Sequence, residues 1–275
     1  MVVKLLEDKN KSKNKKKKTL KKVVRVLARI VVLVIVLAII FSIVFLSGVF
    51  SVKSIEITID GVNQDGESLQ ISEIERLSGL IIGQNLFEIS RGTIKQSILQ
   101  NRYVDSVDVT KHFNGTITIN VEEREVKYLI NYAGSYIYID NKGNILELSS
   151  EKKEVPVILG TSTDFTSLAV GSSENRVTRL NDDDLEKLDV VNNIIEIARS
   201  NDVDALISRI DITDDKNYII YLDSEGKTVY LGDCSNLNTR ILYMKSIIKQ
   251  ESGIQGEIFL NIDLDSEYPY FRESV

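Results

Sequence analysis

Three serines near the start of this 275-residue chain flank a lysine, a grouping that could carry out hydrolysis. Ser47, Ser51 and Ser54 surround Lys53, and serine–lysine pairs close to a membrane are used by anchored peptidases. Lys53, however, lies between residues that favour a β-strand, and no second apolar pocket motif accompanies it. The pattern therefore favours a structural segment over a peptidase site.

Two further residues could take part in nucleophilic catalysis. A Ser-His-Asp hydrolase would need His112, the only histidine, as its base, and the sequence has no Gly-x-Ser-x-Gly motif. Cys234 is the only cysteine, and the carboxylate of the adjacent Asp233 would raise its pKa if the two groups were close. We expect no nucleophile here, and a lone histidine is expected to be structural rather than a metal ligand.

Carboxylates are plentiful, with 40 Asp and Glu against 34 Lys and Arg. Asp182–Asp184 follow Asn181 at the start of a predicted helix, where an N-cap and acidic residues stabilise the positive end of the helix. The segments Asp140–Gly143 and Asp223–Gly226 place Asp first and Gly fourth, as in tight hairpin turns, and neither has the acidic spacing of a calcium loop. No metal or cofactor is expected. A glycosidase needs only two carboxylates, so that class stays open.

A membrane anchor is expected to position everything that follows. Residues 1–29 carry 12 Lys and Arg, and the next 23 residues, Ile30–Val52, carry no charge. As a helix this run would span roughly 34 Å, slightly more than the ~30 Å of bilayer hydrocarbon. We assign a transmembrane helix to residues 30–50, which include Ile30, Leu37 and Phe50. A cleaved signal peptide is the alternative, although its apolar region usually has only about 7–15 residues.

Charge is divided unevenly across this anchor. The basic tail has a net charge of +10, because Glu7 and Asp8 are its only acidic residues, whereas the 22 basic and 38 acidic residues that follow sum to −16. The positive-inside rule predicts a cytoplasmic tail, attracted to anionic membrane lipid, and an outer portion of about 220 residues. The acidic outer portion argues against a nucleic-acid partner, and we expect no small-molecule substrate.

Residues 51–124 are predicted to form the first outer domain. Val52–Asp60 has isoleucines at period two, which indicates a half-buried strand. A short helix with a capping-box pattern at Ser72 and a second helix over Thr93–Leu99 come next. Two strands then flank Asn114-Gly115, a dipeptide preferred in type I′ turns. The expected order is β-α-α-β-β, with two helices on one face of a three-stranded sheet.

Residues 125–275 are predicted to form a second, mixed β domain with two helices, which makes the whole chain α+β. The helices are expected over Asp182–Ser200 and Asn238–Gln250. The expected strands are Tyr128–Asn131, Tyr136–Asp140, Ile145–Leu148, Val157–Leu159, Ser208–Thr213, Tyr218–Asp223, Thr228–Leu231 and Glu257–Ile262.

The last of these strands is the main candidate for binding a partner. Its apolar and polar residues alternate, and if it lies at a sheet edge, its unpaired backbone groups can accept a strand from another chain. Aromatic residues follow it in an otherwise polar tail, and such residues often anchor interfaces, although they can also fold back onto the sheet. The predicted partner-binding residues are Glu257, Ile258, Phe259, Leu260, Asn261, Ile262, Asp263, Tyr268, Tyr270 and Phe271.

The first outer domain, placed directly after a single span, resembles the POTRA domain of the FtsQ/DivIB family of bacterial cell-division proteins. The resemblance is carried by the order and spacing of Phe50–Ile57, Ser78–Leu80, Gly83–Phe87, Asn101–Val104 and Val121–Arg124. Its motif residues are Ser78, Gly79, Gly83, Asn85, Leu86, Phe87, Tyr103 and Val104. The chain departs from the pattern in its unusually acidic second half.

The resemblance implies a non-catalytic protein with one membrane span, located in the cell membrane at the division septum. It implies partners that are single-pass coiled-coil proteins, namely FtsL and FtsB or its counterpart DivIC, with FtsB or DivIC docked on the last strand. The complex would help to control septal peptidoglycan synthesis. The alternatives are a membrane-anchored extracytoplasmic hydrolase or another POTRA-bearing, chaperone-like factor that handles chains along exposed strand edges.

Overall fold

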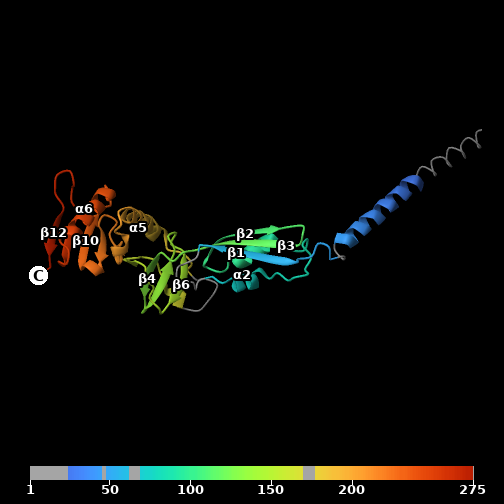
Figure 1. Ribbon diagram of the computed structural model, residues 1–275, viewed down its shortest axis with the longest axis horizontal. Coiled ribbons are helices and arrows are strands. Elements are labelled where there is room, and N and C mark those ends of the chain that lie inside the picture. Colours follow the sequence, from blue (N-terminus) through green and yellow to red (C-terminus); the bar gives the residue numbers. More distant parts are fainter. Residues whose placement is uncertain (1–23, 45–47, 62–68, 170–176, 275) are drawn as a thin grey trace, which may run out of the picture. The chain divides into compact units, whose positions relative to one another are not determined.

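The computed structural model describes residues 24–44, 48–61, 69–169 and 177–274 (Figure 1). Most of the predicted basic tail and Ser47 therefore lie outside the described residues. Within them, one helix, Val24–Val44, is long and apolar enough to cross a membrane, and it contains Ile30 and Leu37. The predicted end of the span at Phe50 is wrong, because this residue lies in a turn and its ring packs edge-on against Phe87, with 5.3 Å between the ring centroids.

The described chain divides into two compact units, of which the first includes this helix, and each unit contains one sheet. The first sheet has the strand order β1-β3-β2, and the isoleucines of β1 are half-buried, as predicted. The buried residues lie mainly on β2, on β3 and on the two helices. This confirms the predicted β-α-α-β-β order. The elements are β1 (Ser54–Asp60), α2 (Ile71–Ser78), α3 (Arg91–Ile98), β2 (Val104–Lys111) and β3 (Thr116–Glu123). Since α2 begins at Ile71, Ser72 lies inside the helix and is not the N-cap that the capping-box pattern suggested.

The turn between β2 and β3 differs from the predicted type I′ turn. His112 donates its N–H to Thr116 O over 2.9 Å, and Gly115 donates its N–H to His112 O over 3.0 Å, so the loop has three residues. In the described part of the chain Gly115 has a positive φ, of 100°, but Asn114 does not. A type I turn followed by a left-handed glycine is the usual geometry of a three-residue hairpin loop. Glycine is needed here, because a Cβ would lie 2.7 Å from Ser51 O.

The second sheet is mixed and has nine strands in the order β12-β11-β10-β9-β8-β7-β4-β5-β6. All eight strands expected in this part of the chain are present, with small shifts of their ends. The strands are β4 (Tyr128–Tyr132), β5 (Ser135–Ile139), β6 (Ile145–Ser149), β7 (Val157–Leu159), β8 (Arg209–Asp211), β9 (Tyr218–Leu222), β10 (Lys227–Gly232), β11 (Gly256–Phe259) and β12 (Tyr270–Glu273). The ninth, β12, has no counterpart in the sequence-based prediction.

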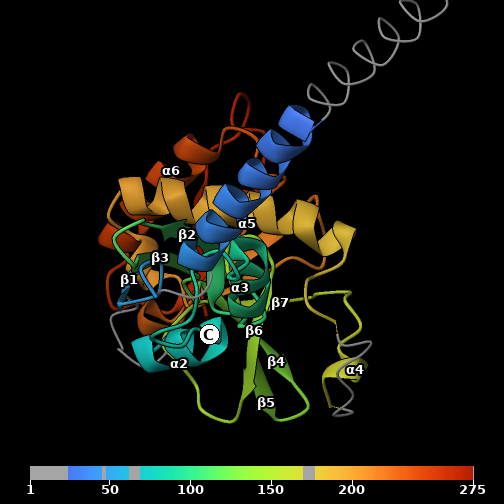
Figure 2. The ribbon, with the colours of Figure 1, turned by 90° about the vertical axis from the view of Figure 1, so that its right-hand side faces the viewer.

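Two long helices, α5 (Asp182–Ser200) and α6 (Leu237–Gln250), pack on one face of this sheet and run side by side (Figure 2). Their buried residues join the strands in one large apolar cluster that includes Leu188, Val191, Ile241 and Met244. A short helix, α4 (Thr166–Ala169), and two 3₁₀ turns (Asp204–Leu206 and Asp223–Glu225) were not predicted.

The N-terminus of α5 forms as the sequence predicts. The Asn181 side chain accepts a hydrogen bond from Asp184 N over 2.8 Å, which is the expected N-cap contact. Along the inner face of the helix Asp184 and Ile194 are buried, while Leu185 and Ile195 are half-buried. Asp184 can be buried because it accepts hydrogen bonds from Ser162 and Thr163.

Candidate strand-docking edge

The predicted partner-binding strand is not an edge of the sheet. β11 lies between β10, to which it is parallel, and β12, to which it is antiparallel. It also ends at Phe259, so Asn261, Ile262 and Asp263 belong to the turn that follows. The alternation of apolar residues indicated which face of the strand is buried but not which strands lie beside it. The edge strand at this end of the sheet is β12.

A tight turn and a row of side chains hold β12 against β11. The Asp263 carboxylate accepts hydrogen bonds from Asp265 N over 3.1 Å and Ser266 Oγ over 2.8 Å, which closes the turn. Beyond it, the ring of Tyr270 stacks on Phe259 with 4.7 Å between centroids, and Phe259 stacks in turn on Tyr230 at 4.9 Å. Stacked rings contribute about 0.5–1.5 kcal/mol beyond the area that they bury.

An ion pair lies next to this aromatic row, on the same face of the sheet. Arg272 of β12 donates from Nε to the Glu257 carboxylate over 2.9 Å and lies 4.9 Å from the centre of the Phe259 ring. Hydrogen bonding from Arg272 lowers the pKa of Glu257. The carboxylate also accepts the Tyr230 hydroxyl over 3.0 Å, and this bond is the main cause of the raised pKa of Tyr230. Aromatic and charged contacts therefore both fix the register of β12.

The direction of each backbone group in β12 follows from this register. Leu260 donates to Tyr230 O in β10, whereas Ser274 donates to Gln255 O, so the backbone groups of β11 point alternately toward β10 and toward β12. Antiparallel pairs alternate between hydrogen-bonded and non-bonded positions. Tyr270 and Arg272 therefore direct their backbone groups toward β11, while Phe271 and Glu273 direct theirs away from the sheet.

These outward backbone groups make β12 the freer of the two sheet edges. At the other edge, the first residue of β6 is covered, because Ile145 donates its N–H to Thr178 O over 2.9 Å. At the β12 edge the outward series offers two N–H donors, from Phe271 and Glu273, and it stops at Pro269, which has no N–H. A short added strand fits this edge.

The predicted partner-binding side chains are not all available at the surface. Ile258 and Leu260 are fully buried in the core, and Phe271, which lies opposite Ile258, packs against the same cluster. Tyr268 is 87% exposed and Tyr270 is 51% exposed. Of the predicted set, the two tyrosines thus remain the most accessible aromatic side chains.

The predicted POTRA motif residues form turns and caps in the first unit. Ser78 Oγ donates to Glu75 O over 2.7 Å at the end of α2, and Gly79 follows with a φ of 62°, a left-handed helix end. Gly83, with a φ of 92°, donates its N–H to Val52 O over 2.8 Å, and Asn85 Oδ1 accepts from Phe87 N over 2.9 Å.

The remaining motif residues are largely structural. Leu86 and Val104 are buried, and Phe87 is half exposed beside Phe50. Tyr103 accepts the Arg124 N–H at its carbonyl over 2.7 Å. The motif residues therefore form the turns, helix ends and buried contacts of this fold. They do not bring reactive side chains together.

The candidate catalytic residues are likewise occupied in structural contacts. Burial, and secondarily the charge of Asp233, raises the pKa of Cys234 to about 12, so the thiol stays protonated at neutral pH. His112 Nε2 lies 3.2 Å from Thr118 Oγ1, and Ser54 Oγ donates to Thr116 Oγ1 over 3.0 Å. In the described part of the chain, no three His, Cys, Asp or Glu side chains are grouped to hold a metal ion.

Both predicted Asp–Gly turns are present but use their carboxylates differently. Asp140 Oδ1 accepts hydrogen bonds from Lys142 N over 2.9 Å and Asn144 N over 2.7 Å, as expected of a turn cap. The second turn closes through Gly226 N, which donates to Asp223 O over 3.2 Å, and the Asp223 carboxylate pairs with another element instead.

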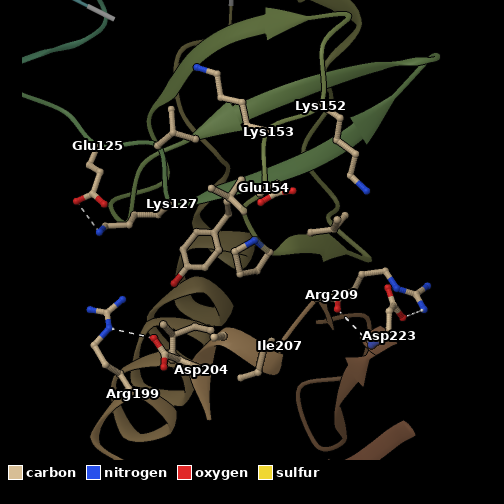
Figure 3. A pocket seen from close by; sticks show the side chains of 18 residues that line it. Glu125, Lys127, Lys152, Lys153, Glu154, Arg199, Asp204, Ile207, Arg209 and Asp223 are labelled. Atoms are coloured by element: carbon tan, nitrogen blue, oxygen red, sulfur yellow. Dashed lines mark hydrogen bonds and ion pairs between the residues drawn. The ribbon is translucent and has the colours of Figure 1, made fainter. Parts of the chain in front are cut away.

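That second carboxylate lines a hollow of about 770 Å³ at the N-terminal ends of β4, β7 and β8 (Figure 3). Arg209 Nη2 lies 2.7 Å from Asp223 Oδ1, and Arg199 Nε lies 3.3 Å from Asp204 Oδ2. Lys127 Nζ lies 2.6 Å from Glu125. Lys152, Lys153 and Glu154 also line the hollow, so its five basic and four acidic side chains sum to a charge of only +1.

The chain was compared with protein-family models and with characterised proteins. Residues 51–124 match the model of the POTRA domain, FtsQ-type. The chain is 23% identical to the cell division protein DivIB of Clostridium botulinum over 202 residues, which cover 74% of this chain and 73% of that protein. It is 23% identical to DivIB of Clostridium tetani over 217 residues, covering 78% and 76%. It is 26% identical to the cell division protein FtsQ of Corynebacterium glutamicum over 179 residues, covering 65% and 72%.

These matches agree with the fold, in which the elements of the β-α-α-β-β unit fall within the matched segment and a mixed sheet follows. The chain thus contains an FtsQ-type POTRA domain at residues 51–124, and along most of its length it is similar to bacterial cell-division proteins named FtsQ and DivIB.

Proposed function

We propose that this cell-division protein is a non-catalytic scaffold with one membrane span, and that it recruits a partner by adding a strand of that partner to β12. Residues 1–29 would lie in the cytoplasm, residues 51–124 would form the POTRA domain, and residues 125–275 would carry the docking edge. The single observation that carries the proposal is the outward pair of N–H and C=O groups on Phe271 and Glu273, which follows from the register of β12.

Side chains on the open face of the sheet support the same site. On the open face of the sheet, neighbouring side chains of β10, β11 and β12 form rows that run across the strands. The side chains of a strand added beside β12 would extend these rows. One of its residues would stand next to Tyr270, whose ring is half exposed, and another next to Arg272. An aromatic residue and an acidic residue two positions apart would suit these two neighbours.

Resemblance to the family suggests which partners to look for. The candidates are single-pass coiled-coil division proteins of the FtsB or DivIC type and of the FtsL type, gathered at the septum, where the complex would help to control septal peptidoglycan synthesis. The alternatives of a hydrolase or a chain-handling factor have no specific observation in their favour.

A proline substitution tests strand addition without breaking the sheet. Glu273→Pro removes an N–H that points away from β11, so it should leave the β11–β12 pairing in place. Glu273→Ala keeps that N–H and serves as the matched control. The full chain, tagged and purified from membranes of dividing cells, should bring down coiled-coil division proteins in the parent and in Glu273→Ala, and at least tenfold less of them in Glu273→Pro.

Equal recovery of those proteins with both variants would refute docking at this edge. Unfolding of the variants, followed by circular dichroism, separates a lost interaction from a lost fold, because Glu273→Pro should unfold at nearly the parent temperature.

A further inference from the structure

The parallel strand–helix–strand unit formed by β10, α6 and β11 ends in a pocket. β10 and β11 are parallel neighbours joined by α6, so the carboxyl ends of both strands and the N-terminus of α6 lie at the same end of the unit. Units of this kind often bind anions there. A pocket of about 570 Å³ lies at this end and is lined by Gly232 at the end of β10, Asn236 before α6 and Asn261 after β11.

The helix N-terminus beside this pocket has no side-chain cap. Asn236 occupies the N-cap position with a left-handed φ of 51°, and its side chain accepts no capping hydrogen bond, in contrast to Asn181 of α5. Arg240 makes the first helical bond, donating its N–H to Asn236 O over 3.2 Å. The amides of residues 237–239 therefore have no helical acceptor, and they contribute to the partial positive charge at this end of the helix.

A buried guanidinium lines the same pocket and is incompletely paired. The Arg240 side chain is only 6% exposed. Its Nε donates to Ser235 O over 2.7 Å, and its Nη2 donates to Ser235 Oγ and Ile262 O over 3.2 and 3.3 Å. Nη1, which lies 3.6 Å from where a Cβ on Gly232 would be, has no partner among the described residues. A buried donor left unpaired destabilises the fold, and an acceptor in the pocket would offset that cost.

The other charged groups of the pocket limit the kind of acceptor. Lys216 adds a second cation, while Asp233 and Asp263 add two carboxylates. The Asp263 carboxylate is used by its own turn, and Asp233 accepts from Ser235 N over 3.0 Å and lies 3.8 Å from Arg240 Nη2. The open donors therefore attract an anion, whereas the two carboxylates disfavour more than one negative charge.

We propose that this pocket binds a singly charged oxyanion, a carboxylate or a phosphate, between Arg240 Nη1 and the N-terminus of α6. Ser235 orients the guanidinium, and Lys216 adds attraction at the rim. The groups involved are distinct from the outward backbone groups of β12. A negative result for anion binding would therefore leave the strand-docking proposal unaffected, and the reverse also holds.

NMR of the isotopically labelled full chain in detergent micelles tests this site. Sodium phosphate at pH 6, where the monoanion predominates, and sodium acetate are titrated separately against sodium chloride of equal ionic strength. The Nε–Hε signal of Arg240 and the amide signals of residues 237–239 should shift saturably with at least one oxyanion and not with chloride. Which of the two anions binds distinguishes a phosphate source from a carboxylate source.

Variants at the rim keep the test decisive even if a change at buried Arg240 impairs folding. Lys216→Gln should weaken binding about threefold and Asp233→Asn should strengthen it by a similar factor, while Lys245→Gln, elsewhere on α6, should leave it unchanged. Arg240→Gln, if folded, should weaken binding at least tenfold. Shifts that are the same in chloride would indicate a nonspecific effect of salt, and an affinity unaffected by both rim variants would place the anion elsewhere. Either result would overturn the proposal.

Discussion

At the scale of single residues, Asp184 shows how a charged side chain stabilises the second unit. Its carboxylate is fully buried and accepts the N–H groups of Ser162 and Thr163 over 2.9 and 2.8 Å, which ties the loop after β7 to the first turn of α5. Burial would raise the pKa of Asp184, but the hydrogen bonds from Thr163 and Ser162 outweigh it and leave the pKa below its usual value. The ionised form is therefore the one that the fold uses.

Asp184→Asn should lower the free energy of unfolding by about 2–3 kcal/mol, because an amide N–H₂ would then face backbone donors. Asp183→Asn, at a position whose side chain is 64% exposed, should change it by less than about 0.5 kcal/mol. Urea unfolding of the full chain measures both. Because the folded pKa of Asp184 is lowered, its contribution is present above the unfolded value of about 3.9 and is lost as the pH falls through the folded value. An equal loss in both variants at neutral pH would contradict this role.

Tyr270 provides a residue-scale prediction for docking. Its ring extends the stack of Tyr230 and Phe259 to the edge of the sheet. Tyr270→Ala should reduce the co-purified division proteins about tenfold, since aromatic side chains at the centre of an interface often contribute 2 kcal/mol or more. Tyr270→Phe keeps the ring and should retain the parent level. A similar loss in both variants would point to the hydroxyl group instead of the stack.

At the scale of elements, β12 makes a prediction about hydrogen exchange. The amides of Tyr270, Arg272 and Ser274 face β11 and should exchange slowly, whereas those of Phe271 and Glu273 face away and should exchange rapidly. Residue-resolved exchange of the full chain measures this two-residue period. Addition of a partner strand should slow Phe271 and Glu273 selectively, and uniform protection along β12 in the unbound chain would show that this edge is already covered.

The elements also show what the sequence could and could not predict. The bounds of α5 were predicted correctly because Asn181 and the acidic first turn mark its start and a long apolar stripe follows. The extent of β11 was overestimated because Ile262 continues the period-two pattern beyond the last paired residue, Phe259. β12 was missed because its four residues, two of them charged, are too few to show an alternation of apolar and polar positions. Its pairing with β11 also depends on the stacking of Tyr270 on Phe259, which the sequence does not reveal.

The candidate sites, too, could be predicted only in part from the sequence. The aromatic residues of the tail could be recognised by their type, but their exposure depends on the sheet order. Arg240 gave no signal in the sequence, because an arginine in a helix is usually solvated. Its burial depends on tertiary contacts with Ser235 before the helix and with Ile262 after β11.

At the scale of the whole molecule, topology is the property to test. The helix Val24–Val44 separates a tail of strongly positive charge from an acidic remainder, so the tail should stay in the cytoplasm. In intact cells stripped of their wall or outer membrane, a protease should digest a C-terminal tag and spare an N-terminal tag. Detergent lysis, as the control, should expose both. A shielded C-terminal tag together with a digested N-terminal tag would reverse the proposed orientation.

The narrow middle of the large sheet has a mechanical consequence. β7 has only three residues and joins two antiparallel blocks, β4-β5-β6 on one side and β8 through β10 on the other, and it meets β4 at the single registered pair of Leu129 and Val157. A pulling load carried across the sheet would concentrate on these few bonds. Under such a load the sheet would separate first between β4 and β7, while the longer pairings of β9, β10 and β11 would hold.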